Sequence, residues 1–328
     1  MNNKFRREKK RYAIDKCDIA LCNGTRFHLR YRTENPENPV LLFLHGGPGS
    51  CDRPLVMNYL SALTDTYTIV CWDQRGAGKS FNLKAAKNEE MTLETCVEDV
   101  HTVINHLKKR FLQDKIVVVG HSWGSLLGVL TASRYPEDIA AYLGIGQFVN
   151  GEENERLSYE FTMNEARRRH DRKALRDLVK IEEPNRGLYK NERDFIVQRN
   201  YLQKFGGAFY NTEESIARFV LRAILSTNEY SLLDYVRYLM GRRHCMHQLY
   251  SQMIETDFFQ SISGLSVPVC FTQGRHDYNT PSVLARRWFE ALNAPKKEFI
   301  WFEHSAHSPQ FEEPQRWMQT VRRVLKHQ

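Results

Sequence analysis

Short uninterrupted runs of apolar residues alternate along this chain with segments whose apolar residues recur every three or four positions. Runs such as Ile116–Val119 are typical of strands buried on both faces, whereas the pattern over 92–112 predicts an amphipathic helix. Strands are predicted at 17–22, 26–32, 39–45, 66–73, 115–120, 139–146, 267–273 and 298–303. Strands that alternate with helices indicate a mostly parallel, doubly wound α/β sheet.

The alternation stops between residues 151 and 258, where the sequence predicts consecutive helices. Strand-like runs resume at Val267, so the simplest interpretation is a helical insertion between two strands of one sheet. We therefore expect 1–150 and 259–328 to form the core. Residues 151–258 should form a cap over the carboxyl ends of the strands, where α/β sheets bind ligands.

Two local signals predict where elements turn or begin. Asn23 and Gly24 separate the first two predicted strands, and such a pair is a strong signal of a β-hairpin. Thr280 precedes Pro281, an order that predicts an N-cap followed by proline at the first helical position. A helix is therefore expected over 281–292.

Composition excludes several classes of protein. The 328 residues are 41% hydrophobic and 26% charged, which is enough apolar surface for a packed core. The apolar runs are too short for a transmembrane helix, and the basic first residues are not expected to be a secretory signal.

Charge and cysteine content indicate the surroundings of the protein. The net charge of the whole chain is +8, and residues 1–16 alone carry seven basic and two acidic side chains. This concentration of charge at one end favours a solvated tail. Seven cysteines without a CxxC pair favour reduced thiols and a cytoplasmic protein.

Residues 120–124 form a G-x-S-x-G pattern, Gly-His-Ser-Trp-Gly. It directly follows an apolar strand and precedes a helical run, which is the context of a nucleophile turn. Small residues on both sides permit a sharp turn that lifts the Ser122 hydroxyl clear of the sheet. Ser122 is therefore predicted to be a nucleophile, and the Trp123 N–H at the helix N-terminus to stabilise an oxyanion. The alternative is a chance match in a tight turn.

A glycine-rich loop follows the apolar residues 39–44 and reads His-Gly-Gly-Pro-Gly over 45–49. Glycines allow backbone N–H groups to approach a substrate oxygen closely. Gly47 is the preferred second oxyanion donor, and Gly46 is the other candidate. The alternative is a turn that binds no ligand.

A serine nucleophile needs a histidine base, and the histidine needs an orienting carboxylate. Asp277 follows the seventh predicted strand and His307 lies on the loop after the eighth, so both belong to one edge of the sheet. The chain order Ser122, Asp277, His307 is that of α/β-hydrolases. His304 competes for the role of base, but the position of His307 farther out on the loop favours His307.

With these motifs in place, the chain resembles an α/β-hydrolase of the prolyl aminopeptidase (proline iminopeptidase) type. The resemblance rests on His45–Gly49, Trp72–Ser80, Gly120–Ser125, Gly274–Asp277, and Ala306–His307 followed by Glu312–Pro314. It implies an eight-stranded core, a helical cap, and no metal or organic cofactor.

Two features matter for the activity that the resemblance implies. The family usually has glycine where this chain has His121. Its peptidases hold the free amine of the substrate with acidic residues of the cap, because a buried ammonium needs a carboxylate partner. No cap motif selects among the candidates, each of which is otherwise an ordinary surface acid: Glu152, Glu153, Glu155, Glu213, Glu214 and Glu229.

The sequence therefore predicts a serine hydrolase that acts through an acyl-enzyme. The leading hypothesis is an aminopeptidase that releases an N-terminal proline or small apolar residue from short peptides or amides. The alternatives are an esterase, lactonase or amidase acting on a small acyl compound, and a non-catalytic ligand-binding protein on a hydrolase scaffold. The expected partner is a small-molecule or short-peptide substrate, with no nucleic acid and no membrane; the oligomeric state stays open.

Overall fold

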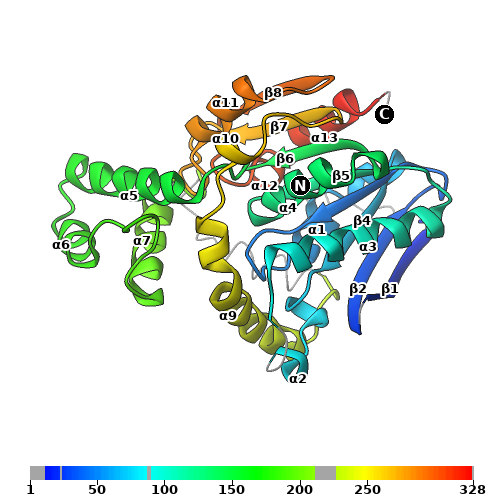
Figure 1. Cartoon of the computed structure of the whole chain (residues 1–328), viewed down its shortest axis with the longest axis horizontal. Coiled ribbons are helices and arrows are strands. Elements are labelled where there is room, and N and C mark those ends of the chain that lie inside the picture. Colours follow the sequence, from blue (N-terminus) through cyan, green and yellow to red (C-terminus); the bar gives the residue numbers. More distant parts are fainter. Residues whose placement is uncertain (1–11, 23, 87–89, 211–226, 327–328) are drawn as a thin grey trace, which may run out of the picture.

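The computed structural model describes residues 12–22, 24–86, 90–210 and 227–326, and within them eight strands form one sheet (Figure 1). Their order across the sheet is β1-β2-β4-β3-β5-β6-β7-β8. The strands are β1 (Ile14–Cys22), β2 (Thr25–Thr33), β3 (Val40–Leu44), β4 (Thr68–Asp73), β5 (Ile116–His121), β6 (Ile139–Ile145), β7 (Val269–Gly274) and β8 (Lys297–Phe302). All eight predicted strands are confirmed. Pairing is antiparallel for β1–β2 and β2–β4 and parallel across the rest of the sheet.

Helices connect the strands (Figure 1). They are α1 (Arg53–Tyr59), α2 (Leu83–Ala86), α3 (Leu93–Phe111), α4 (Trp123–Arg134), α10 (Phe258–Ser261), α11 (Ser282–Ala291), α12 (Pro309–Glu312) and α13 (Pro314–Val324), with 3₁₀ turns η1 (Ser61–Asp65), η2 (Gly78–Ser80) and η3 (Pro136–Asp138). The helix predicted over 92–112 is confirmed as α3. The Thr92 side chain accepts the Thr95 N–H at its start, and Leu112 ends it with a left-handed φ of 52°.

Both faces of the sheet are buried, as the continuous apolar runs require. In β3, Val40, Leu42 and Leu44 belong to one apolar cluster, which also holds residues of α3, α4 and α11. Leu41 and Phe43 alternate with them and belong to a second cluster with residues of α1 and α13. Because successive side chains of a strand point to opposite faces, this division places a helical layer on each side of the sheet.

Between β6 and β7 the chain forms α5 (Gly151–Arg168), α6 (Arg172–Ile181), α7 (Glu192–Lys204) and α9 (Leu232–Ile254), with no strand in the residues described there. We call these four the inserted helices. Helices α5 to α7 project to one side of the sheet, whereas α9 returns along the core (Figure 1). The division into a core and a cap at residues 151 and 258 stays a prediction.

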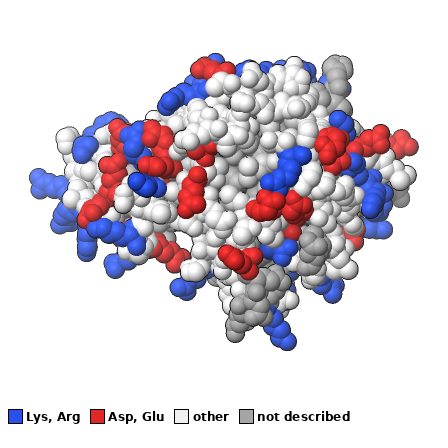
Figure 2. Space-filling view, in the orientation of Figure 1, with Lys and Arg blue, Asp and Glu red and all other residues white. Residues whose placement is uncertain are grey.

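Charged side chains of both signs are interspersed over the projecting helices (Figure 2). Arg168 and Arg169 pair with Glu165, and Lys173 pairs with Asp177. These pairs balance much of the basic charge of α5 and α6. Within the described ranges, every helix is too short or too polar to cross a membrane.

Helix α9 packs tightly against two loops of the sheet. A Cβ placed on Gly241 would lie 2.2 Å from the main-chain oxygen of Gly76. A Cβ on Gly49 would lie 2.8 Å from the Arg242 Cα and 3.0 Å from the Cys245 Cβ. Since Cβ atoms do not approach backbone this closely, the glycines permit a contact that larger residues would force apart.

The expected start of the helix over 281–292 is wrong by one residue. Helix α11 begins at Ser282, and Pro281 occupies its N-cap position without a side-chain cap. The Thr280 hydroxyl instead donates to Asp277 Oδ2 at 2.9 Å. The hairpin of β1 and β2 is confirmed by their antiparallel pairing, although Asn23 lies outside the described residues.

Candidate active site

Ser122 occupies a strained turn between β5 and α4. Its φ of 56° and ψ of −119° lie outside the regions that most residues adopt. A Cβ on Gly120 would lie 2.4 Å from the main-chain oxygen of Gly124, and one on Gly124 would lie 2.0 Å from that of Leu44. The two glycines of the G-x-S-x-G pattern are therefore required by space, and they give Ser122 the geometry expected of a nucleophile turn.

Asp277 and His307 are bonded to each other at the carboxyl ends of β7 and β8. The His307 Nδ1 lies 3.0 Å from Asp277 Oδ2, and Asp277 is fully buried. The same oxygen accepts hydrogen bonds from Gln273 Nε2 and the Thr280 hydroxyl, each at 2.9 Å. The other oxygen accepts the N–H groups of Asn279 and Thr280, also at 2.9 Å. All of these contacts present a donor to the carboxylate.

This arrangement fixes the tautomer of the histidine. Because the Asp277 carboxylate only accepts, Nδ1 of His307 carries the hydrogen. Its Nε2 therefore has a free lone pair and can accept a proton. The sequence singled out Asp277 and His307 but not Gln273, and it assigned Thr280 to a helix cap. The only signal for Gln273 was its place near the end of a predicted strand.

Ser122 lies beside this pair without touching it. Among the described residues, no hydrogen bond joins the Ser122 hydroxyl to His307. The link is the neighbouring His121, whose ring centroid is 4.9 Å from that of His307. Contacts between nucleophile and base are often loose without substrate and tighten in the reacting complex. The structure thus pairs Asp277 with His307, and His121 connects this pair to the turn that carries Ser122.

Gly46 and Gly47 differ in what their N–H groups do. The Gly46 N–H points to Asp52 Oδ2 at 3.4 Å, and its main-chain oxygen accepts from His45 Nδ1 at 2.8 Å. In a trans peptide the N–H of the next residue points opposite to that oxygen, so the Gly47 N–H points away from His45. The Gly47 φ of 136° requires glycine. Gly47 therefore stays the preferred candidate donor, since the Gly46 N–H already faces Asp52.

A buried network connects this loop to Trp123, the other candidate donor. The Gln74 N–H donates to His45 Nε2 at 3.1 Å, which leaves the hydrogen of His45 on Nδ1. Gln74 Nε2 donates to the His45 oxygen, and Gln74 Oε1 accepts from the Trp123 indole, each at 3.0 Å. Burial lowers the pKa of His45, which fits this neutral ring. The network holds the glycine loop against the turn that carries Ser122.

The Glu312 carboxylate holds the loop of His307 from the other side. One oxygen accepts the N–H groups of Ala306 and Ser308, both at 3.0 Å, and the other accepts the Tyr210 N–H at 2.7 Å. Burial raises the pKa of Glu312 to about 7, although the three N–H bonds act in the opposite direction. The residues on both sides of His307 are therefore anchored by one side chain.

Glu312→Gln is expected to remove a pH-dependent part of the stability. The folded pKa of about 7 lies above the ordinary 4.5, so the contribution of Glu312 to the unfolding free energy falls as the pH rises through that window. Relative to the glutamine variant, the wild type should lose about 1–3 kcal/mol between those pH values. Urea unfolding across the pH range measures this, with the exposed Glu303→Gln as a control; identical slopes for all three proteins would contradict it.

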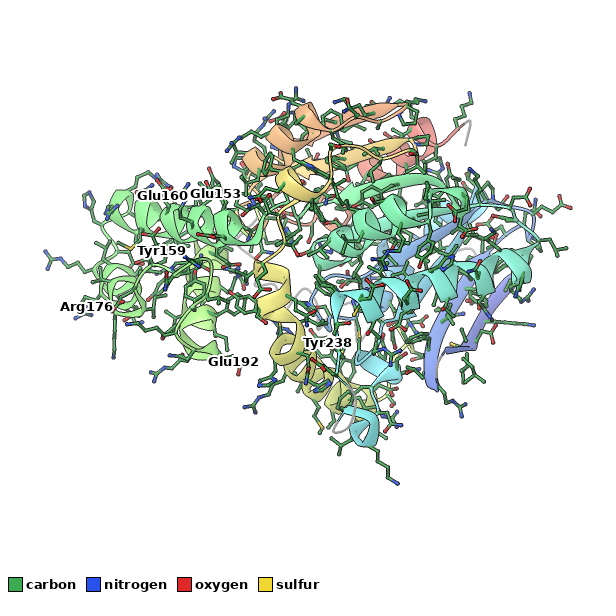
Figure 3. The ribbon with its side chains drawn as sticks, in the orientation of Figure 1. Glu153, Tyr159, Glu160, Arg176, Glu192 and Tyr238 are labelled. Atoms are coloured by element: carbon green, nitrogen blue, oxygen red, sulfur yellow. The ribbon has the colours of Figure 1, made fainter. Side chains whose placement is uncertain are left out.

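Four of the six glutamates proposed to bind an amine lie among the described residues, and three of these are exposed or paired with arginine. Glu152 is exposed, and Glu153 forms two hydrogen bonds with Arg156 and points away from α6 and α7 (Figure 3). Glu229 is buried against β2, where both its oxygens accept from Arg30 Nε at 3.1 Å. Glu213 and Glu214 lie outside the described residues.

Glu155 is the remaining candidate, and its position differs. It is 1% exposed, one oxygen accepts from Arg199 and Asn154, and Oε2 has no partner among the described residues. Burial raises the pKa of Glu155, opposed by Arg199. Asn154 donates to the Asn279 oxygen at 3.0 Å, and the Asn279 N–H donates to Asp277. Glu155 is therefore adjacent to Asn154, which contacts the loop that carries Asp277.

His304, the competing candidate for the base, does not contact Asp277. His304 is exposed, and its main-chain N–H donates to the Glu313 carboxylate. In the portion of the chain that the structure describes, no three His, Cys, Asp or Glu side chains gather in a way that could hold a metal ion.

Comparison with known proteins supports the fold and the family. The sequence model of the alpha/beta hydrolase fold matches residues 39–314. A curated relative, the "Probable aminopeptidase YbaC" of Bacillus subtilis (strain 168), is 32% identical over 322 residues and covers 98% of each chain.

Two solved structures share the fold at low sequence identity. A proline iminopeptidase-related protein from Thermus thermophilus has a TM-score of 0.65 at 16% identity, over 95% of this chain and 98% of that one. Est816, described as an N-acyl homoserine lactone degrading enzyme, has a TM-score of 0.64 at 15% identity, over 93% and 99%. With the family model matching most of the sequence, the chain belongs to the α/β-hydrolase fold family.

Proposed function

We propose that this α/β-hydrolase is a serine hydrolase that acts through an acyl-enzyme. The observation that carries the proposal is the buried Asp277–His307 pair, which the His121 side chain connects to the strained strand-to-helix turn of Ser122. These are the three groups that a serine nucleophile requires. The Gly47 N–H and the N-terminus of α4 at Trp123 supply the oxyanion donors.

In the proposed reaction, Ser122 attacks the substrate carbonyl while His307 Nε2 takes the proton of the hydroxyl. The N–H groups of Gly47 and Trp123 bind the oxygen that becomes negative. His307 then gives the proton to the leaving amine or alcohol, and a water activated by the same nitrogen releases the acid. Asp277 holds the imidazole in the required tautomer and stabilises its cation throughout.

The proposed substrate is a short peptide or amide with an N-terminal proline or small apolar residue. Support comes from the relative named an aminopeptidase and from the buried Glu155, whose Oε2 has no partner among the described residues. An ammonium placed at that oxygen would supply the donor that the buried carboxylate lacks. The inserted helices are proposed to form the cap that limits access to small substrates.

Acetylation of the substrate amine is expected to lower kcat/KM at least tenfold, because a charge-assisted contact with the carboxylate is worth about 1.5–3 kcal/mol. Glu155→Gln should reduce turnover of the free-amine substrate by a similar factor and leave the acetylated one unaffected. The measurement uses matched prolyl and acetylprolyl chromogenic amides. Glu153→Gln, on the same helix and already paired with Arg156, serves as the control and should change neither.

A second candidate is an esterase, lactonase or amidase that acts on a small uncharged acyl compound. It is favoured by the arginine partners of Glu153 and Glu229, which leave those carboxylates less available to a substrate amine. Equal turnover of the free and acetylated substrates, with activity still dependent on Ser122, would support this candidate and exclude the aminopeptidase.

We further propose a cytoplasmic location. Six of the seven cysteines have side chains that the structure describes; all six are free, and four of them are buried. Reduced, buried thiols are typical of proteins that stay in a reducing compartment.

A further inference from the structure

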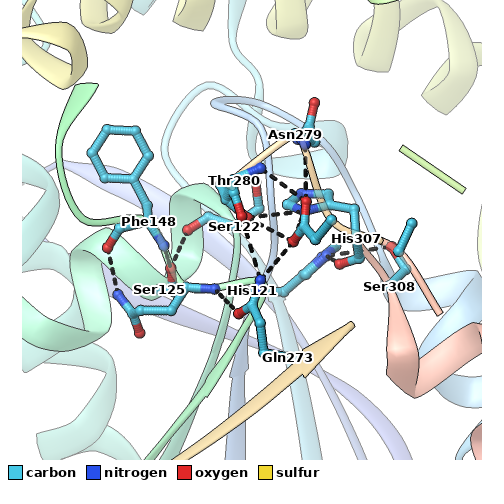
Figure 4. Close-up of polar contacts among 12 residues, drawn as sticks. His121, Ser122, Ser125, Phe148, Gln273, Asn279, Thr280, His307 and Ser308 are labelled. Carbon is cyan, nitrogen blue, oxygen red and sulfur yellow. Dashed lines mark hydrogen bonds and ion pairs between the residues drawn. The ribbon is translucent and has the colours of Figure 1, made fainter. Parts of the chain in front are cut away.

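His121, the residue before the proposed nucleophile, contacts the loop of the proposed base. Its Nε2 lies 3.0 Å from the main-chain oxygen of His307 and 3.4 Å from Ser308 Oγ (Figure 4). A carbonyl oxygen can only accept, so Nε2 of His121 must carry the hydrogen of the shorter contact. The side chain therefore donates to the main chain of the residue whose ring is the base.

The other nitrogen of His121 meets Asp52, the residue before α1. Nδ1 lies 3.3 Å from Asp52 Oδ2, and the same oxygen is 3.4 Å from the Gly46 N. Burial alone would raise the pKa of Asp52, but the hydrogen bonds from His121 and Gly46 and the nearby His45 lower it below its ordinary value. Asp52 therefore accepts from both loops, which requires the His121 ring to carry a hydrogen on each of its two nitrogens.

These contacts join three loops that are distant in the sequence. Gly46 follows β3, His121 is the last residue of β5, and His307 follows β8; the contacts span 6, 69 and 186 positions. We propose that His121, held by Asp52, is a positioning residue that fixes the main chain of His307 relative to Ser122 and the glycine loop. The proposal rests on the serine-hydrolase function above.

The physical reason is that the reaction tolerates little displacement of its catalytic groups. Movement of a catalytic group by about 1 Å can cost a hundredfold in rate. Because Ser122 and His307 are not bonded to each other, their spacing depends on the contacts of their loops. Glu312 anchors the N–H groups that flank His307, and His121 anchors its oxygen. The His121 contact is the one that ties this loop directly to the residue preceding Ser122.

The test is the rate at which a fluorophosphonate labels Ser122, which needs the base and the oxyanion donors but no particular substrate. His121→Phe keeps a ring but has no donor, and it is expected to lower the labelling rate about ten- to a hundredfold. Asp52→Ala should lower it similarly. Asp52→Asn, whose amide can donate to His121 Nδ1 and accept from Gly46, should stay within about threefold of the wild type.

Rescue by Asp52→Asn separates positioning from general stability. If Asp52 only stabilised the fold, Asp52→Asn and Asp52→Ala would label at the same rate per folded molecule. The double variant Asp52→Ala/His121→Phe should lose less than the product of the two single losses, because both changes remove the same contact between Asp52 and His121. His101→Phe is the control: His101 also pairs with an aspartate, Asp138, at 2.9 Å, but on α3. It should label at the wild-type rate.

The outcomes are distinguishable. A wild-type protein that does not react overturns the proposed serine mechanism itself. A reactive wild type together with a folded His121→Phe variant that labels within about twofold overturns the positioning role. If His121→Phe does not fold, equal labelling of Asp52→Ala and Asp52→Asn overturns it instead.

Discussion

Replacing Ser122 with alanine is expected to lower kcat by roughly four to six orders of magnitude, whichever acyl substrate is used. The variant keeps the oxyanion donors and the Asp277–His307 pair, but it has no hydroxyl to form the acyl-enzyme. The loss should fall on kcat rather than on KM, because the removed interaction exists only in the reacting state. Steady-state kinetics with a chromogenic ester or amide measures it.

Ser125→Ala is the control for this experiment. Ser125 lies in the same turn, and its hydroxyl donates to the Ser122 oxygen at 2.6 Å. We expect it to retain covalent labelling by fluorophosphonate, whereas Ser122→Ala should show none. Undiminished turnover in Ser122→Ala would contradict the mechanism, and labelling that persists there would assign the reactive hydroxyl to another residue.

Asp277→Asn is expected to lower kcat by about four orders of magnitude with the protein still folded. The N–H groups of Asn279 and Thr280 demand an acceptor at one position of this side chain, so the new amide nitrogen must face His307 Nδ1. An amide donor there drives the histidine hydrogen to Nε2, and the base loses the lone pair that accepts the serine proton.

Asp138→Asn provides a matched control, since Asp138 forms a comparable contact with His101 on α3. Its kcat should stay within about twofold of the wild type. Circular dichroism checks the fold of both variants. A kcat for Asp277→Asn within about tenfold of the wild type would show that the carboxylate does not set the tautomer.

Strands and the nucleophile turn were predictable because their signals are local. The apolar run that forms β5 and the two glycines around Ser122 specify a buried strand and a sharp turn within about ten residues. The placement of Asp277 and His307 at one sheet edge followed from the order of parallel strands. The start of α11 was predicted wrongly because the Thr280 hydroxyl donates to Asp277 instead of capping the helix.

The supporting contacts were not predictable because their partners are distant in the sequence. Asp52 and His121 are 69 positions apart, and Glu229 meets Arg30 across 199 positions. A carboxylate that a tertiary ion pair already occupies looks the same in the sequence as one that is free for a ligand. Hence the six candidate glutamates could not be ranked before Glu155 was seen with an unpartnered oxygen.

The close approach of α9 to Gly49 and Gly76 has a consequence for building chimeric hydrolases. A chimera that took all four inserted helices from a relative would bring a foreign surface against both loops, and any side chain at position 241 would collide with the Gly76 backbone. The glycine loop over 45–49 would shift, and the chimera would lose rate for reasons unrelated to the residues that contact its substrate. Grafting α5 to α7 while retaining the native α9 preserves the contact of α9 with the loops of Gly49 and Gly76. This is the better way to exchange substrate specificity between such hydrolases.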